Sequence, residues 1–223
     1  MSEIAVLPNN IKQILERNLG ELSTIEGNII SVAEQREIKT MLYTSCNNGE
    51  GKTISSVSMA YALSTMTNSK ILLIDGNLHN PAIHSLFDID PEPGLSDLIM
   101  KGADYDAVLR ESEFKNLYVM PCGSEVLSAP EVYKAECFGE KLNHYKEHFD
   151  YVIFDGRSMS SSSGATIIAR LFDGVVMVIE CEKTRWEVFS TTKEKIEKVG
   201  AEILGVVLNK RKYYIPRFLY GKI

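Results

Sequence analysis

Residues 45–53 read Ser-Cys-Asn-Asn-Gly-Glu-Gly-Lys-Thr, and they stand between a short apolar run and a segment with helical spacing. Glycines in such a place let the backbone turn its N–H groups toward a polyphosphate, and the start of the following helix adds positive potential. Lys52 is placed to reach the β and γ phosphates, and Thr53 to offer its hydroxyl to Mg²⁺. The order of strand, glycine-rich loop and helix therefore predicts a phosphate-binding loop.

One position departs from the phosphate-loop motif. The first glycine of the motif is replaced by Cys46, so that only Gly49 and Gly51 remain. The alternative interpretation is a turn that contains Gly-Lys-Thr by chance. The flanking strand and helix favour the phosphate loop over that alternative.

Five short apolar runs are rich in β-branched and aromatic residues, and they predict buried strands covered on both faces. They lie at residues 41–43, 71–74, 151–154, 175–179 and 203–208. Segments with helical spacing stand between them, at 55–66, 135–148 and 185–199. Strands that alternate with helices predict a three-layer α/β domain of the P-loop NTPase type, with a mostly parallel, doubly wound sheet.

The two ends of the chain differ from this central domain. We expect residues 1–37 to form an arm packed on the domain, with a short helix at 9–19 and no strong period beyond it. Residues 38–210 should form the ATP-binding domain. Residues 211–223 should form a basic tail that contains tyrosines.

Two aspartates end predicted strands. Asp75 closes the run Ile-Leu-Leu-Ile-Asp, and Asp155 closes Tyr-Val-Ile-Phe-Asp. Because the carboxyl ends of parallel strands open on the ligand crevice, both acids should point toward the phosphates. Asp155 suits the role of holding Mg²⁺ through water, and Asp75 that of orienting or deprotonating a nucleophile. The alternative is a pair of acids that cap loops or pair locally.

The charge distribution bears on partners and location. The chain carries a net charge of −6, yet from Lys210 to the end it has five basic residues and no acidic one, so the rest carries −11. Such an acidic body argues against a nucleic-acid partner. The four cysteines form no C-x-x-C pair, and no apolar run approaches the ~20 residues of a membrane helix. We therefore expect a reduced, cytoplasmic protein whose membrane role, if it has one, is peripheral.

Further motifs follow the phosphate loop in a fixed order. They are ILLIDGNLHNPAIHSLF at 71–87, GLSDLI at 94–99, NLYVMPCG at 116–123, FDYVIFD at 149–155 and GAEILGVVLNK at 200–210. Over residues 38–212 the chain resembles the cytoplasmic kinase domain of bacterial protein-tyrosine kinases (BY-kinases), a branch of the MinD/ParA-like P-loop ATPases.

The resemblance implies a function. It implies ATP and Mg²⁺ as cofactors, autophosphorylation on C-terminal tyrosines and control of exopolysaccharide polymerisation or export. The implied partner is an inner-membrane adaptor of the polysaccharide co-polymerase type, which would hold a cytoplasmic protein at the membrane periphery. Phosphate transfer to a neighbouring copy implies a homo-oligomer.

The resemblance also assigns residues one by one. Lys52 and Thr53 match the Walker-A pair, Asp75 the first acid of the element that follows it, and Asp155 the Walker-B acid. The catalytic candidates are thus Lys52, Asp75 and Asp155, and the metal candidates are Thr53, Asp75 and Asp155. The nucleotide-binding candidates are Asn48, Gly49, Glu50, Gly51, Lys52, Thr53, Ile54 and Asn209, the last at the position where relatives contact adenine.

Four positions do not match the family pattern. They are Asn77 in place of a second acid, His79-Asn80 near an expected arginine, Gly156-Arg157-Ser158 after the Walker-B acid, and Glu16-Arg17 in place of a ring-forming helix motif. Asn77 keeps the shape of an aspartate but removes a negative charge beside a dication, which lowers metal affinity. Two other functions therefore stay open: a catalytically weakened pseudokinase that acts as a nucleotide-dependent regulatory module, and a MinD/ParA-like localising ATPase.

The tail Lys-Arg-Lys-Tyr-Tyr-Ile-Pro-Arg-Phe-Leu-Tyr-Gly-Lys-Ile contains the candidate phosphate acceptors Tyr213, Tyr214 and Tyr220. Each added phosphate would change the charge of the tail by roughly −1.5 to −2. The same residues could instead lie on an anionic bilayer, although Pro216 interrupts a helix there. A chain end without a role is the third interpretation.

Overall fold

A computed structural model of the chain describes residues 4–124, 135–160 and 163–211. One sheet runs through the molecule in the order β3-β4-β2-β5-β1-β6-β7, and only the short pairing of β3 with β4 is antiparallel. The strands are β1 Thr40–Ser45, β2 Ile71–Asp75, β3 Arg110–Glu111, β4 Leu117–Met120, β5 Tyr151–Asp155, β6 Gly174–Glu180 and β7 Ile203–Asn209. The predicted mostly parallel α/β sheet is confirmed.

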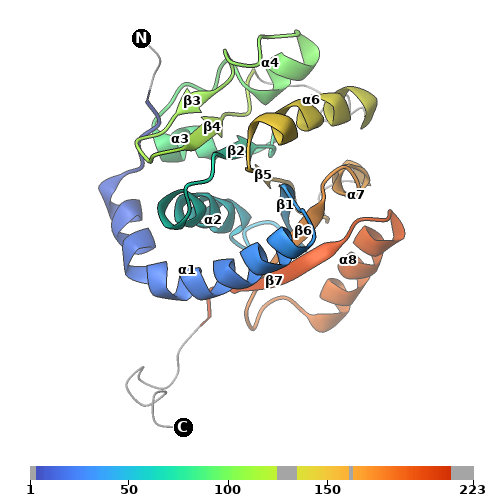
Figure 1. Cartoon of the computed structure of the whole chain (residues 1–223). Coiled ribbons are helices and arrows are strands. Elements are labelled where there is room, and N and C mark those ends of the chain that lie inside the picture. Colours follow the sequence, from blue (N-terminus) through green and yellow to red (C-terminus); the bar gives the residue numbers. More distant parts are fainter. Residues whose placement is uncertain (1–3, 125–134, 161–162, 212–223) are drawn as a thin grey trace.

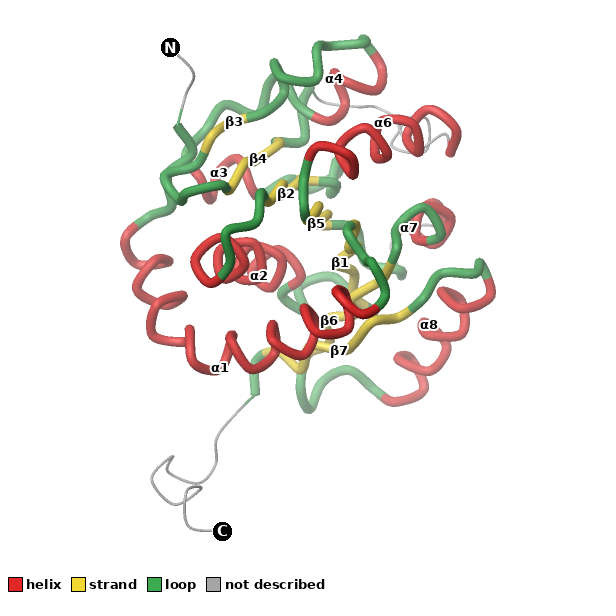
Figure 2. Tube along the Cα trace, viewed as in Figure 1, coloured by secondary structure: helices red, strands yellow, loops and turns green. Residues whose placement is uncertain are grey.

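Helices cover both faces of the sheet, as Figures 1 and 2 show. One face packs against α1 Asn9–Gln35 and α2 Lys52–Met66, and the other against α6 Ala135–His148, α7 Ser163–Ala169 and α8 Trp186–Lys198. Two short helices, α3 Ile83–Phe87 and α4 Leu95–Met100, follow β2 in the chain. The architecture therefore has the three layers that the sequence predicts.

The central strands divide their side chains between two apolar cores. In β1, Met41 and Tyr43 pack with Leu63 of α2, whereas Leu42 packs with Phe138 of α6 on the opposite face. All six residues of β1 are buried. Because successive side chains of a strand point to opposite faces, an uninterrupted apolar run is needed to fill both cores.

The N-terminal region contains a longer helix than the sequence predicts. The short helix expected at 9–19 continues to Gln35 as the single helix α1. Leu15, Ile29 and Ala33 fall on one side of this helix and are buried in the core shared with α2. Apolar residues recur every three or four positions from Ile11 to Ala33, so the sequence carries a helical period along the whole of α1, which the expectation of a short helix overlooks. Upstream of it, the backbone N–H of Ala5 donates to the Glu111 carbonyl at 2.8 Å, which ties the arm to β3.

The last strand, β7, differs from its prediction in another way. From Gly205 onward its residues alternate between half-buried and exposed, with Val206 41% and Leu208 61% exposed. The expectation that this run is covered on both faces is wrong, because β7 ends the sheet order and pairs only with β6. Strand β3 has no apolar run, and the apolar run Leu-Tyr-Val-Met of β4, which is as long as the run at 71–74, is not among the predicted strands.

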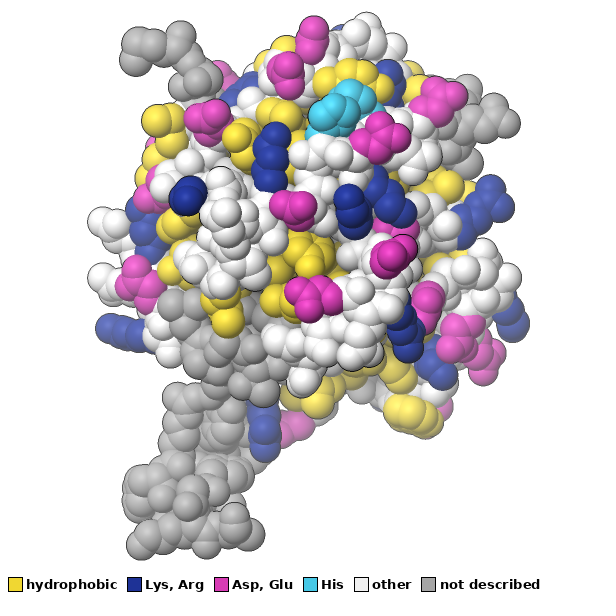
Figure 3. Space-filling view, in the orientation of Figure 1, with side chains coloured by type: hydrophobic (Ala, Val, Ile, Leu, Met, Phe, Trp, Pro, Cys, Tyr) yellow, Lys and Arg dark blue, Asp and Glu magenta, His cyan; other side chains and the backbone are white. Residues whose placement is uncertain are grey.

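The surface shows how charge is spread over the body of the protein. On the face in Figure 3, acidic and basic side chains are interspersed instead of gathered by sign. Among the helices that the structure describes, none is long and apolar enough to cross a membrane.

Candidate functional site

The phosphate loop, residues 46–51, joins β1 to α2. Gly49 (φ 80°) and Gly51 (φ 98°) adopt left-handed backbone conformations, which a residue with a Cβ enters only at a cost. At Gly51, a Cβ would also collide with the side-chain amide of Asn209. The two glycines that the motif keeps are therefore those whose conformation requires glycine.

Cys46, where the motif departs from its pattern, has a different environment. It does not adopt a positive φ, so the backbone does not require glycine at this position. The thiol is buried, and burial raises its pKa. A neutral, buried thiol packs as a small apolar group and is a poor nucleophile. The replacement is thus compatible with an intact loop.

Beneath the loop, Lys52, Thr53 and Asp155 form the polar centre of the site. Thr53, in the first turn of α2, donates its hydroxyl to Oδ2 of Asp155 at 2.6 Å. Lys52 and Asp155 are both buried, at 6% and 0% exposure. Oδ1 of Asp155 is buried and has no hydrogen-bond partner among the residues that the structure describes. A buried carboxylate oxygen without a partner is costly, and a ligand at this position would relieve that cost.

The charges of this centre influence one another. Burial, followed by the nearby charge of Asp75, raises the pKa of Asp155 to about 7, while the hydrogen bond from Thr53 and the charge of Lys52 act to lower it. Burial lowers the pKa of Lys52, against the attraction of Asp155 and Glu50. Burial thus makes the charged forms of Lys52 and Asp155 less favourable, and pKa values shifted in this way are common at functional sites.

The second acid, Asp75, lies beside Asp155 in the sheet. The two residues are register partners in the parallel strands β2 and β5, which confirms that both strand ends meet. The carboxylate of Asp75 accepts hydrogen bonds from the backbone N–H groups of Ala82 and Ile83, both at 2.9 Å, and of Asn77 at 3.2 Å. Burial raises its pKa, and these three bonds lower it. Asp75 thus also caps the turn that leads into α3.

These residues fit a magnesium ion. Mg²⁺ prefers oxygen ligands, keeps several waters and uses one or two carboxylates together with the phosphates of a nucleotide. The Thr53 hydroxyl and the unpartnered Oδ1 of Asp155 offer such oxygens in one place. Within the described ranges, no group of three or more His, Cys, Asp or Glu side chains could hold a metal by itself. An ion here would complete its coordination with water and phosphate.

Asn77, which replaces the second family acid, stabilises a turn. Its side-chain Nδ2 donates to the backbone carbonyl of Asn80 at 2.9 Å. An aspartate carboxylate only accepts hydrogen bonds, so it could not make this contact. The amide therefore has a structural use at the position where it removes a charge.

The side chains of the remaining nucleotide-binding candidates lie in different environments. Asn48 accepts a hydrogen bond from the hydroxyl of Ser158 at 2.6 Å. Asn209 donates to the backbone carbonyl of Glu50 at 2.9 Å, so its amide braces the loop. Ile54 is 45% exposed in the first turn of α2.

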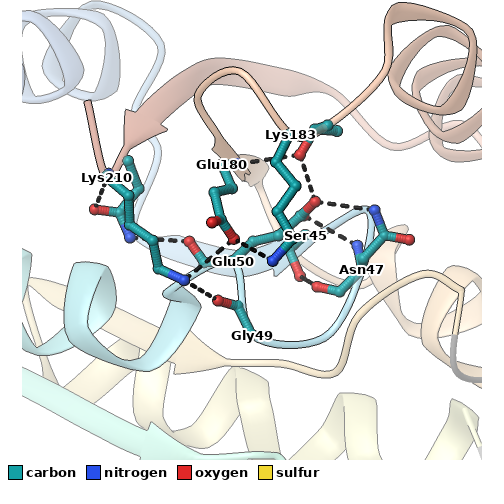
Figure 4. Close-up of polar contacts among 9 residues, drawn as sticks. Ser45, Asn47, Gly49, Glu50, Glu180, Lys183 and Lys210 are labelled. Atoms are coloured by element: carbon teal, nitrogen blue, oxygen red, sulfur yellow. Dashed lines mark hydrogen bonds and ion pairs between the residues drawn. The ribbon is translucent and has the colours of Figure 1, made fainter. Parts of the chain in front are cut away.

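Glu50 points away from the phosphate side of the loop. Its carboxylate is buried, and it accepts from the backbone and side chain of Asn47, both at 3.0 Å, and from Thr184 at 2.6 Å (Figure 4). In this arrangement Glu50 offers a ligand only its backbone. Its side chain ties the loop to the segment after β6.

Sequence reasoning missed the residues that hold the loop from outside. Glu180 and Thr184 lie at and after the end of β6, and Lys210 follows β7. Thr184 and Lys210 contact the loop, and Glu180 pairs with Lys210, because the carboxyl ends of neighbouring parallel strands meet at one edge of the sheet. The rule that places Asp75 and Asp155 at this edge applies equally to the residues at the ends of β6 and β7.

Comparisons with known proteins identify the family to which this site belongs. Residues 38–206 match the family described as an AAA domain. CapB of Staphylococcus aureus is 31% identical over 186 residues, covering 83% of this chain and 81% of CapB. CpsD of Streptococcus agalactiae, which is named as a tyrosine-protein kinase, is 30% identical over 176 residues, covering 78% of this chain and 76% of CpsD. The chain belongs to the bacterial tyrosine-protein kinase family. Membership of this kinase family implies nucleotide binding.

Solved structures agree with the assignment to the kinase family. The VpsO kinase domain superposes with a TM-score of 0.81 at 26% identity, over 92% of this chain and 100% of that domain. MinD of Pyrococcus horikoshii, solved with Mg-ADP, shares the fold with a TM-score of 0.62 at 21% identity, over 81% of this chain and 75% of MinD. The kinase fold and the MinD fold are thus variants of one P-loop architecture.

The first prediction concerns the buried lysine. Lys52→Met removes the ammonium group under the loop, and we expect it to abolish ATP·Mg²⁺ binding to the purified protein, as measured by isothermal titration calorimetry. Lys198→Met, at an exposed ion pair with Glu194, is the matched control and should bind like the wild type. Unchanged affinity in Lys52→Met would contradict the assignment of the site.

The second prediction concerns pH. Because the pKa of Asp155 rises from 3.8 to about 7 on folding, the folded state holds the proton more tightly, and stability falls as pH rises through that window. In EDTA, Asp155→Asn should therefore gain stability over the wild type between pH 5 and pH 8, by on the order of a few kcal/mol. Thermal denaturation at several pH values measures this.

The control for the pH experiment is Asp97. Burial opposes ionisation of Asp97, but hydrogen bonds, first those from Lys101 and Ser124, outweigh it and lower its pKa to about 2. Its contribution to the free energy of unfolding is nearly complete by about pH 5, so the difference between Asp97→Asn and the wild type should stay constant from there to pH 8. Equal pH dependence in the two variants would contradict the raised pKa of Asp155.

Proposed function

We propose that this protein is a protein-tyrosine kinase that uses ATP and Mg²⁺. The observation that carries the proposal is the centre formed by buried Lys52 and Asp155 with Thr53 under the phosphate loop, where one carboxylate oxygen has no partner in the described part of the chain. Phosphoryl transfer needs positioning and charge neutralisation more than covalent help from the protein. A buried cation and a metal-accepting carboxylate supply those two requirements.

Each residue has a role in this proposal. Lys52 would neutralise charge on the transferred phosphate, and Thr53 and Asp155 would hold the metal. Bound Mg²⁺ would supply further neutralisation of the β and γ phosphates. Asp75 would orient the tyrosine hydroxyl and take its proton, and its raised pKa makes it a stronger base than a free aspartate.

The proposed acceptors are Tyr213, Tyr214 and Tyr220 of a neighbouring copy. These tyrosines lie outside the described residues, and the resemblance to the family supports their role. The tail that contains them follows Lys210, whose side chain contacts the phosphate loop. A basic tail and an acidic body would attract each other between copies, and salt would screen that attraction.

The proposed setting is polysaccharide export. We propose that the protein controls polymerisation or export of an exopolysaccharide at the inner membrane, through an adaptor of the polysaccharide co-polymerase type. Membership of the kinase family supports this setting. Such an adaptor would explain how a catalytic domain of this kind works at a membrane.

The third prediction tests the kinase reaction. Incubation with ATP·Mg²⁺ should add increments of about 80 Da to the intact mass, with and without cytoplasmic adaptor segments present. A variant with phenylalanine at positions 213, 214 and 220 should lose the increments while still binding ATP. Asp155→Asn should lose the increments with the tail intact. No increments in the wild type, even with an adaptor segment, would contradict the proposal.

The fourth prediction tests the pseudokinase alternative. Asn77→Asp restores the second acid, and we expect it to raise Mg²⁺ affinity and the rate of autophosphorylation by about tenfold, because a negative charge returns beside the dication. The variant should also lose about 1 kcal/mol of stability, since the hydrogen bond to Asn80 is lost. Asn80→Asp, which keeps Asn77, is the control for added charge nearby. No gain in rate would favour a regulatory module.

A further inference from the structure

Lys210, the first residue after β7, contacts the phosphate loop from outside. Its Nζ donates to the backbone carbonyl of Gly49 at 2.7 Å and pairs with Oε2 of Glu180, at the end of β6, at 3.1 Å. Figure 4 shows the lysine side chain reaching from the β7 end to both groups. A single ammonium group therefore links the loop to the ends of two strands.

The backbone on both sides of this contact is held in an unfavourable conformation. Lys210 (φ 56°) and Glu182 (φ 64°) adopt left-handed conformations although neither is glycine. The backbone N–H of Lys210 donates to the side-chain oxygen of Asn209 at 2.8 Å, which holds its conformation. Strained residues persist where surrounding contacts over-determine them, and they gather at functional sites.

A second set of contacts braces the next residue of the loop. The Thr184 hydroxyl accepts from the backbone N–H of Glu180 at 3.2 Å and donates to the carboxylate of Glu50 at 2.6 Å. Asn209 holds the backbone carbonyl of Glu50. Residues at or just after the ends of β6 and β7 thus hold two consecutive loop residues, Gly49 and Glu50. None of these contacts uses the backbone N–H groups of Gly49 and Glu50, which a ligand would need.

The contact between Lys210 and the Gly49 carbonyl is important because that carbonyl points away from the N–H groups of the loop. A phosphate loop directs N–H groups inward, so its carbonyl groups turn outward and need partners of their own. The ammonium of Lys210 satisfies one of them, and a charged donor makes a stronger hydrogen bond than a neutral one. Hydrogen bonds from Lys183 and Lys210 lower the pKa of Glu180, so its carboxylate stays ionised at neutral pH.

We propose that Lys210 and Glu180 form a clamp that positions the phosphate loop for its nucleotide. The clamp rests on the proposed function, because it assigns positioning residues to the same ATP site. An exposed ion pair alone contributes little. Lys210 differs from a residue in an ordinary exposed ion pair because it also donates a hydrogen bond to the Gly49 carbonyl. It therefore holds the backbone of the loop that would bind phosphate.

The fifth prediction compares two lysines that share Glu180 as a partner. Lys210→Met should weaken binding of a fluorescent ADP analogue in Mg²⁺ by about tenfold, the effect of losing one charged hydrogen bond that shapes the site. Lys183 also pairs with Glu180, at 3.1 Å, but the structure shows it in no hydrogen bond or ion pair with the described loop residues. Lys183→Met should therefore bind within about twofold of the wild type. Equal affinity in Lys183→Met and Lys210→Met would overturn the clamp.

A conservative substitution and steady-state kinetics distinguish a positioning role of Lys210 from a role in stability alone. Lys210→Arg keeps the charge and the reach, and it should bind within about threefold of the wild type. In autophosphorylation, Lys210→Met should raise the KM for ATP more than it lowers kcat, because the clamp acts on ground state and transition state alike. A loss confined to kcat would overturn the proposal.

Two further outcomes keep the test decisive. If Lys210→Met does not fold, Glu180→Gln, which frees the lysine from its carboxylate, should weaken binding by about threefold, and wild-type affinity there would overturn the clamp. If the wild type binds no nucleotide, the proposed function and the clamp both fail. Binding by the wild type with no loss in Lys210→Met overturns the clamp alone.

Discussion

A loop that binds polyphosphate must present backbone N–H groups without partners and still keep one conformation. Such a loop cannot be stabilised by its own backbone hydrogen bonds, because those donors must remain for the ligand. In this protein the outer side of the loop is held instead. Ser158 contacts Asn48, and Asn209 contacts Glu50. These contacts come from the segment after β5 and from the last residue of β7, so the order of strands in the sheet determines the shape of the loop.

The acids beneath the loop face a second constraint, which is the crowding of like charges in a buried place. Asp75 and Asp155 are register partners without exposure to solvent; burial first, and then the charge of Asp75, raises the pKa of Asp155. Lys52 offsets part of that cost. A third carboxylate at position 77 would add to the crowding when no dication is bound. The amide of Asn77 avoids this and stabilises the turn at Asn80, which gives the departure a physical reason.

Apolar runs determine strands reliably when both faces are covered, and less well elsewhere. The runs at 41–43 and 151–154 predicted β1 and β5 because every residue in those strands is buried. The run at 203–208 predicted β7 but not its exposure, since an edge position depends on the order of strands. In α1 the apolar residues do recur at helical spacing as far as Ala33, and packing against α2 buries that side of the helix.

Residue types at short, fixed spacings are enough to identify the phosphate loop, the two strand-end acids and the α/β class. The three-dimensional arrangement is needed to see which carboxylate oxygen of Asp155 lacks a partner among the described residues, and that the side chain of Glu50 is taken up by contacts with Asn47 and Thr184. It is also needed to see that Lys210 reaches Gly49, 161 residues away in the chain. Contacts of this kind depend on which strand ends lie together, and a linear pattern of residues does not specify the order of strands in a sheet.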